Sequence, residues 1–205
     1  GPGSRWLRTA VMRLHEVKKG PPFRWIHDST DRGTHQGRKG KIEMKEKANE
    51  TAQCNRWEAF LDEAVGDDKA IKCLQEFFGY CLTEDVFLSK ALVLYGSGLG
   101  KSVVVHVLRD LVGPESVSSL LLEDLADQFL RGLLYKRAVN FSCEFPYTDQ
   151  ARAYFKKIVS GDSINAACRQ QGSFEFLPTC KLVIHCNHIP IEFRESCALQ
   201  RRILM

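Results

Sequence analysis

The segment Gly96-Ser-Gly-Leu-Gly-Lys-Ser102 contains the residue types that point most directly to chemistry. A glycine-rich turn lets backbone N–H groups face the phosphates of a nucleotide, and a helix that begins after the turn adds its positive N-terminal end. Lys101 would reach the β- and γ-phosphates, and the Ser102 hydroxyl would hold Mg²⁺. The predicted ATP site therefore comprises Gly96, Ser97, Gly98, Leu99, Gly100, Lys101 and Ser102.

The spacing of this segment departs from the usual phosphate-binding loop. In the pattern G-x-x-x-x-G-K-[ST], counting back from Gly100 puts Tyr95 at the first position. Either Tyr95 replaces a glycine or the loop is one residue shorter. A shorter loop offers fewer amide donors, so we expect impaired ATP affinity or hydrolysis. The alternative is an incidental Gly-Lys-Ser in an ordinary glycine-rich turn.

The surrounding elements favour a strand before the loop and a helix after it. Short apolar runs alternate downstream with an amphipathic segment, which indicates an α/β fold with a mainly parallel sheet and helical cover. The expected strands span 90–95, 138–143 and 181–186, and the expected helices of this region span 101–112 and 149–159.

Composition divides the chain into four segments. Residues 1–4 have the composition of a tag remnant and are excluded from fold reasoning. Residues 5–50 are expected to form a helix and a basic linker, because they carry 12 Lys or Arg and 6 Asp or Glu. This segment either contacts nucleic acid or is a solvated linker. Residues 51–89 predict a small helical bundle, with helices at 57–65 and 67–82, and residues 90–205 predict the core, which we expect to be incomplete at its C-terminus.

The eight cysteines are scattered without a C-x-x-C pair, which favours a reduced, intracellular setting. A zinc site from Cys180, His185, Cys186 and His188 is an alternative. A buried strand at this position would point successive side chains to opposite faces, which disfavours convergence on one ion. Because no apolar stretch approaches the roughly 18 to 20 residues that cross a bilayer, we expect a soluble, cytoplasmic protein without a membrane partner.

From Trp57 to Arg202 the sequence resembles the superfamily 3 helicases fused to primases in phages, plasmids and poxviruses. Trp57-Glu-Ala-Phe-Leu61 and Phe77-Phe-Gly-Tyr-Cys-Leu-Thr83 are similar to the helical segment before the loop in that family, and the glycine segment is similar to its Walker A motif. That motif normally has one more residue, which favours a deletion. Val139-Asn-Phe-Ser-Cys-Glu144 resembles the Walker B strand, and Lys181-Leu-Val-Ile-His-Cys-Asn187 resembles motif C.

The resemblance implies a P-loop NTPase core of the AAA+-like kind and roles for further residues. Glu144 would activate the attacking water and share Mg²⁺ with Ser102, and Asn187 would sense the γ-phosphate. Arg201 or Arg202 would reach the nucleotide of a neighbouring subunit. Each of these roles has a structural alternative. Glu144 could be a surface carboxylate, Asn187 could cap a strand, and the arginine pair could form a cationic helix end.

Residues 163–176 resemble the hairpin that in this family projects into a central channel. Arg169 and Gln170 would lie at its tip and contact nucleic acid, with Lys157 as a further candidate, although a plain surface turn and solvated helix charges are alternatives.

The order of these motifs implies an ATP-dependent DNA helicase motor of a mobile-element replication protein, using ATP and Mg²⁺. The expected partners are single-stranded or forked DNA, further copies in a ring, with six as the expected number, and a primase domain or replication initiator. The host cell would be bacterial or virus-infected. A rival hypothesis is a DNA-bound assembly or helicase-loading module whose shortened loop no longer hydrolyses ATP. A third and weaker hypothesis is a small-molecule kinase, because the sequence shows no site for a phosphate acceptor.

Overall fold

The computed structural model describes residues 54–98, 100–168 and 172–205. The helix and the basic linker predicted within residues 5–50 therefore lie outside the described residues, as do Leu99, Arg169 and Gln170.

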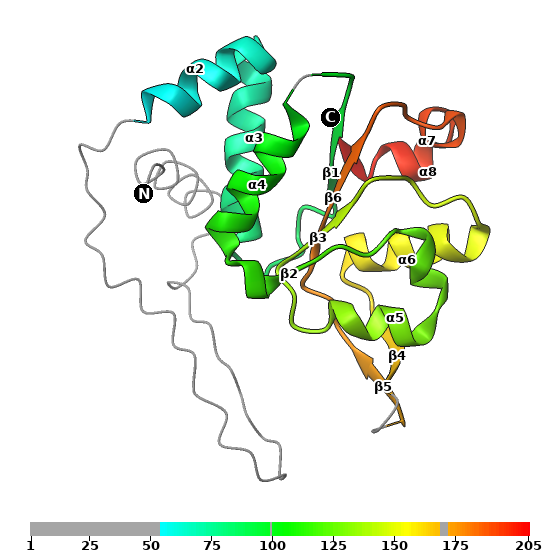
Figure 1. The fold of residues 1–205 in the computed structure, drawn as a ribbon. Helices are drawn as coiled ribbons and strands as arrows, with labels where there is room; N and C mark the ends of the chain where they lie inside the picture. Colours follow the sequence, from blue (N-terminus) through cyan, green and yellow to red (C-terminus); the bar gives the residue numbers. More distant parts are fainter. Residues whose placement is uncertain (1–53, 99, 169–171) are drawn as a thin grey trace, which may run out of the picture.

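Within the described residues, five strands form one sheet whose neighbouring strands are all parallel (Figure 1). The order across the sheet is β2-β3-β6-β1-β7. The strands are β1 (Ala91–Tyr95), β2 (Val117–Ser118), β3 (Val139–Ser142), β6 (Lys181–Cys186) and β7 (Ile203–Leu204). The strands predicted at 90–95, 138–143 and 181–186 are confirmed, with slightly shorter bounds for the first two. The edge strands β2 and β7 were not predicted.

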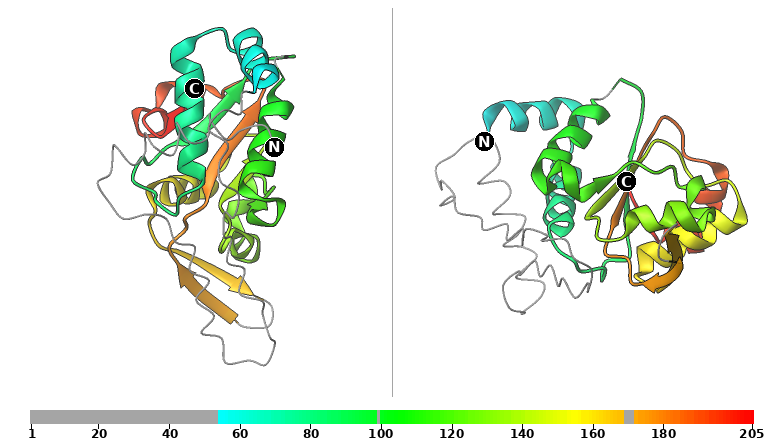
Figure 2. Two further views of the ribbon diagram at one scale, coloured as in Figure 1. Left: turned by 90° about the vertical axis from the view of Figure 1, so that its left-hand side faces the viewer. Right: turned by 60° about the horizontal axis from the view of Figure 1, so that its bottom comes forward.

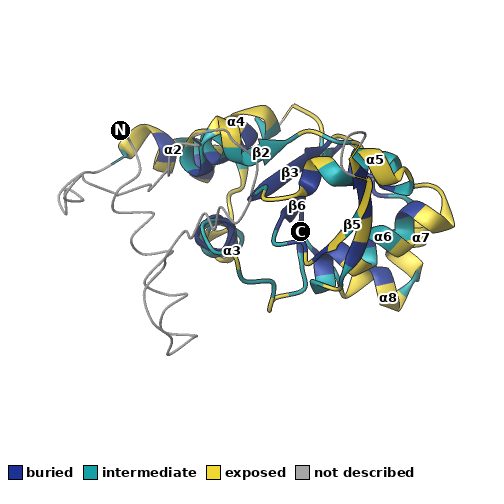
Figure 3. Ribbon diagram, turned by 90° about the horizontal axis from the view of Figure 1, so that it is seen from below, coloured by how far each residue is buried: buried dark blue, intermediate teal, exposed yellow. Residues whose placement is uncertain are grey.

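Both faces of the sheet are covered, so the central strands are buried almost throughout. Leu92 and Val183 lie side by side in register and belong to the apolar cluster on one face. The next pair, Val93 and Ile184, belongs to the cluster on the other face. This alternation is what a strand covered on both faces requires, since successive side chains point in opposite directions. Figure 3 shows the buried strands between the two groups of helices.

One face is covered by α2 (Asn55–Ala64), α3 (Asp68–Cys81) and α4 (Lys101–Val112). Helix α3 begins at a capping residue, because the Asp67 carboxylate accepts hydrogen bonds from the amides of Lys69 (3.2 Å) and Ala70 (3.3 Å). Trp57 of α2 stacks on Phe78 of α3, with ring centroids 6.4 Å apart. The two predicted upstream helices are thus confirmed, and they share one apolar cluster with α4 and the sheet.

The other face is covered by α6 (Asp149–Ser160) and by short helical segments. Helix α6 was predicted; it starts at Thr148, whose hydroxyl accepts from the Ala151 amide (3.3 Å), and it ends at Gly161 in the left-handed conformation. The short segments are η2 (Glu123–Ala126), α5 (Gln128–Arg131), η3 (Gly132–Leu134), α7 (Ile191–Glu195) and α8 (Cys197–Gln200), whereas η1 (Pro114–Ser116) follows α4 and contacts it.

A hairpin formed by β4 (Ile164–Cys168) and β5 (Gly172–Phe176) extends from this body. Its strands are antiparallel, with Ile164 opposite Phe176 and Cys168 opposite Gly172. Figures 1 and 2 show the hairpin projecting away from the sheet, at the end opposite to the turn that joins β1 to α4. A hairpin at 163–176 is therefore confirmed.

None of the helices in the described part of the chain combines the length and apolar composition needed to cross a bilayer.

Candidate functional site

The glycine turn joins β1 to α4 at the carboxyl edge of the sheet. Tyr95 is the last residue of β1 and pairs with Cys186, whereas Gly96 has a φ of +117° and starts the turn. Gly98 and Gly100 also have positive φ values, of +72° and +70°. Such values are costly for residues with a Cβ atom, which explains the glycines. Because Tyr95 belongs to the strand, the geometry favours a shortened loop over replacement of a glycine by Tyr95.

Lys101 and Asn187 meet beside this turn. Lys101 is the first residue of α4, and its Nζ donates to the carbonyl of Gly96 and, over 3.1 Å, to Oδ1 of Asn187. Asn187 directly follows β6, and β6 pairs with β1, so the parallel register brings the two strand ends to one edge. A cation and an exposed amide thus converge within reach of the turn.

His185 adds to the electrostatics of this edge. It pairs with Leu94 in the sheet and is half-buried. Burial, together with the nearby positive charge of Lys101, lowers the pKa of His185 below its usual value. The neutral form of His185 is therefore favoured, and Lys101 supplies positive charge beside the turn.

Glu144 lies at the same edge of the sheet, two strands away from β1. Ser142 is level with Ile184 of β6, which is level with Val93 of β1. Neighbouring strands are about 4.8 Å apart, so Ser142 lies roughly 10 Å from Val93, and the turn starts three residues beyond Val93. Glu144 is exposed two residues beyond β3, and β6 with Asn187 at its end lies between β3 and β1.

A tyrosine that sequence reasoning missed holds the Glu144 side chain. The Tyr147 hydroxyl donates to Glu144 Oε2 over 2.9 Å, and this bond raises the pKa of Tyr147. The Tyr147 and Thr148 amides both donate to Glu123 Oε2, at 2.7 and 3.2 Å. Interactions with Thr148 and with these amides lower the pKa of Glu123. In the sequence, the only sign of this contact was that Tyr147, which can donate a hydrogen bond, follows Glu144 by three positions.

The two predicted Mg²⁺ ligands are both accessible. Ser102 is exposed in the first turn of α4, and Glu144 is exposed after β3. A hydroxyl and a carboxylate are oxygen donors of the kind that Mg²⁺ accepts together with water and phosphate oxygens. These residues therefore fit the ion by chemistry and by placement at one sheet edge.

The arginine pair lies at the opposite edge of the sheet. It precedes β7, whose first residue pairs with Ala91 at the start of β1. With about 3.3 Å per residue, the end of β1 is roughly 13 Å further along. Arg202 is engaged within the chain, because its guanidinium donates to Ala198 O (2.6 Å) and to Ser160 Oγ (3.4 Å). Arg201 is exposed, so it is the better placed of the two to act outside its own chain.

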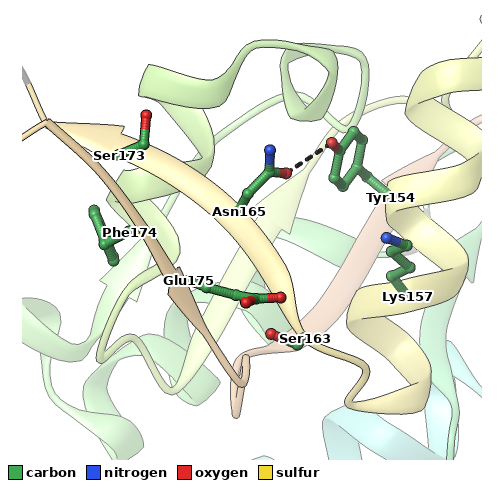
Figure 4. A pocket seen from close by; sticks show the side chains of 7 residues that line it. All are labelled: Tyr154, Lys157, Ser163, Asn165, Ser173, Phe174 and Glu175. Atoms are coloured by element: carbon green, nitrogen blue, oxygen red, sulfur yellow. Dashed lines mark hydrogen bonds between the residues drawn. The ribbon is translucent and has the colours of Figure 1, made fainter.

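The residues predicted to contact nucleic acid belong to the hairpin and to the neighbouring helix α6. Lys157 is exposed on α6 and faces a pocket between α6 and the hairpin (Figure 4). The Tyr154 hydroxyl donates across this pocket to Asn165 Oδ1 over 2.9 Å. Beneath it, the buried Arg131 guanidinium donates to Asn165 O (2.8 Å) and lies 3.7 Å from the Tyr154 ring centroid. The base of the hairpin is thus fixed to α5 and α6.

The cysteine and histidine residues near β6 are divided between the core and the surface. Cys180 and Cys186 are buried in the apolar cluster that contains α6, whereas His188 is exposed. Among the described residues, no three His, Cys, Asp or Glu side chains are grouped so that they could hold a metal ion.

A family model described as a family of unknown function (DUF5906) matches residues 94–202, more than half of the chain. The chain therefore belongs to this family. The matched segment includes the glycine turn, Asn187 and the arginine pair. A search among curated proteins found no match.

Two solved structures of the NrS-1 C-terminal region, both apo and in the A form, have a similar fold. One gives a TM-score of 0.52 at 18% sequence identity and covers 72% of this chain and 35% of that chain. The other gives a TM-score of 0.50 at 16% identity and covers 65% and 33%, respectively. This chain thus spans about a third of the length of these structures, and at such identities the similarity concerns the fold.

Proposed function

We propose that this chain is the ATP-hydrolysing motor of a superfamily 3 DNA helicase from a mobile-element replication protein. The observation that carries the proposal is the convergence of the glycine turn, Lys101 and Asn187 at the carboxyl edge of a parallel sheet. Ligands of such sheets bind in this position, and a lysine that leads a helix after a glycine turn suits a triphosphate.

Each residue at this edge has a distinct role in the proposed reaction. Lys101 neutralises charge on the β- and γ-phosphates, and its contact with Asn187 brings the amide next to the γ-phosphate. Asn187 then orients the attacking water, and Glu144, held by Tyr147, accepts its proton. Ser102 and Glu144 would hold Mg²⁺, which when bound supplies charge neutralisation between the phosphates.

The proposed assembly is a ring, with six as the expected number of copies. Arg201 precedes β7, whose first residue is level with the start of β1, roughly 13 Å before the turn, so Arg201 would act on the nucleotide of a neighbouring copy. The hairpin, with Lys157 nearby, would contact single-stranded DNA at a fork, and Arg169 and Gln170 stay predicted contacts. A linked primase domain or replication initiator and a cytoplasmic site in bacteria or infected cells belong to the same proposal.

The direct test is ATP turnover with and without single-stranded DNA. Lys101→Ala should reduce DNA-stimulated turnover at least a hundredfold, because an uncompensated phosphate charge in the transition state is costly. Lys69→Ala is the matched control, since Lys69 is also a lysine in the first turn of its helix and lies away from the site on α3. Unchanged turnover in Lys101→Ala would rule out the assigned site.

A mixing experiment tests the shared site. Lys101→Ala and Arg201→Ala should each be inactive, yet an equimolar mixture should regain part of the activity, because some interfaces then pair an intact Lys101 with an intact Arg201. No recovery, in a mixture shown to co-assemble, would argue against donation of Arg201 to a neighbour.

The rival function is a DNA-bound assembly or loading module that binds ATP without hydrolysing it. The shortened turn favours it, because fewer amides are available to the phosphates. Calorimetric ATP binding by the wild-type protein, without turnover in the presence of DNA, is the outcome that would select this function.

A further inference from the structure

A phenylalanine of α2 lies directly against the last glycine of the phosphate-binding turn. A Cβ atom placed on Gly100 would lie 2.6 Å from Cε2 and 2.7 Å from Cζ of Phe60. Carbon atoms do not approach so closely, so the ring occupies the space that a side chain at Gly100 would need. The edge of the Phe60 ring, at Cε2 and Cζ, therefore closes the space beside the turn at Gly100.

The Phe60 ring is itself supported from the core. It stacks on Trp57, with ring centroids 5.4 Å apart and an interplanar angle of 22°. Trp57 in turn stacks on Phe78 of α3, and both of these side chains are buried. Three aromatic rings thus connect the core to Gly100, and displacement of the Phe60 ring would disturb each contact in the series.

Gly100 is the position at which the shape of the turn determines the direction of Lys101 and Ser102. Its φ of +70° lies in the left-handed region, and α4 begins at the next residue. Glycine has no Cβ to restrict this conformation, so the backbone needs an external restraint. A turn that is one residue shorter than usual also has fewer backbone amides to bind phosphate. A misaligned amide therefore costs a larger share of the binding.

We propose that Phe60 is a positioning residue that holds Gly100, and through it Lys101 and Ser102, in the conformation that accepts phosphate. The inference rests on the proposed ATP site, and it assigns a nucleotide-binding role to α2, whose Phe60 precedes Gly100 by 40 positions in the sequence. Phe60 raises the affinity for ATP by fixing the shape of the turn before ATP binds. It does not touch the reacting atoms, so the rate of the bound complex should stay nearly the same.

The experiment uses the full chain and compares the wild type with Phe60→Ala and Phe60→Leu. Leucine keeps an apolar side chain without the ring, so it carries the test if the alanine variant does not fold. Phe87→Ala is the matched control, because Phe87 is a partly exposed phenylalanine that packs on Tyr80.

Two measurements are made on each variant. Hydrogen exchange without nucleotide should be about three- to tenfold faster in the 96–102 peptide of Phe60→Ala and Phe60→Leu, as loss of one aromatic contact predicts. The KM for ATP should rise about three- to tenfold, while kcat stays within about twofold. If Phe60 only stabilised the fold, its replacement would lower the free energy of unfolding. It would not raise KM selectively while leaving kcat unchanged.

Exchange and KM at wild-type values in Phe60→Ala or Phe60→Leu would overturn the inference, as would an equal effect of Phe87→Ala. If the wild-type protein neither binds nor hydrolyses ATP, the proposed function fails. The exchange measurement then still decides whether Phe60 restrains the turn.

Discussion

Lys181 offers a perturbation whose size can be worked out from the structure. It is the first residue of β6, and its side chain is 3% exposed. Its Nζ donates to the carbonyls of Thr83 and Thr179 and lies 4.8 Å from the Tyr80 ring centroid. Burial lowers the pKa of Lys181 from 10.5 to about 8. We predict that Lys181→Met changes how the free energy of unfolding depends on pH.

The sign follows from comparing the folded and unfolded states. Below pH 8 both states hold the proton, and the folded state bears the full cost of a buried ammonium. As the pH rises from about 8 to about 10.5, the folded state loses the proton first, so the cost disappears and stability increases. The difference in pKa corresponds to about 3 kcal/mol.

Methionine has a similar length and no charge, so it avoids this cost at every pH. It also leaves the carbonyls of Thr83 and Thr179 without their donor, at about 1 kcal/mol each. At pH 7 we expect Lys181→Met to be more stable than wild type by about 1 kcal/mol, and near pH 10.5 to be less stable by about 2 kcal/mol.

The assay is urea unfolding of both proteins in steps from pH 7 to pH 10.5, with a common m-value for each pair. The exposed Lys72→Met on α3 is the control, and its curve should run parallel to that of the wild type. A constant difference between wild type and Lys181→Met over the whole range would refute the reasoning.

Three further predictions concern stability and assembly. Asn140→Ala should lower the free energy of unfolding by about 2 to 4 kcal/mol in urea titrations, because this buried amide accepts from Ser118 Oγ (2.8 Å) and bonds both backbone groups of Leu120. Gly161→Ala should cost at least about 1 kcal/mol in thermal unfolding, since φ is +74° and the new Cβ would lie 2.3 Å from Val86 Cγ2. Arg202→Ala should lower the melting temperature, whereas Arg201→Ala should leave it within about 1 °C and affect only turnover.

The sequence predicted the long elements because each carries a periodic apolar pattern. The run before Gly96 and the run before Asn187 were expected as strands, and both are buried on two faces. The helix after Gly100 was expected from the glycine turn and its apolar spacing. The two strand runs have a length of five or six residues, which favours a strand over a helix, and the turn residues after each run support this choice.

Short elements and long-range contacts could not be predicted in this way. The strands β2 and β7 contain two residues each, so they have no periodicity. The burial of Arg131 depends on carbonyls of Leu125 and Asn165 that only the fold brings together. The contact of Lys101 with Asn187 spans 86 positions and depends on β6 lying next to β1, which motif order does not specify.

The position of Arg201 ties the proposed chemistry to assembly. Lys101, Ser102, Glu144 and Asn187 are presented at the carboxyl edge of the sheet, whereas the arginine pair precedes the strand that starts at the amino edge. Arg202 is occupied by Ala198 and Ser160, and Arg201 precedes Ile203, which is level with Ala91, roughly 13 Å before the end of β1. If an arginine neutralises charge in the transition state, a second copy must supply it. A lone chain should then bind ATP through its own turn yet hydrolyse it slowly, and turnover should rise with protein concentration as copies associate.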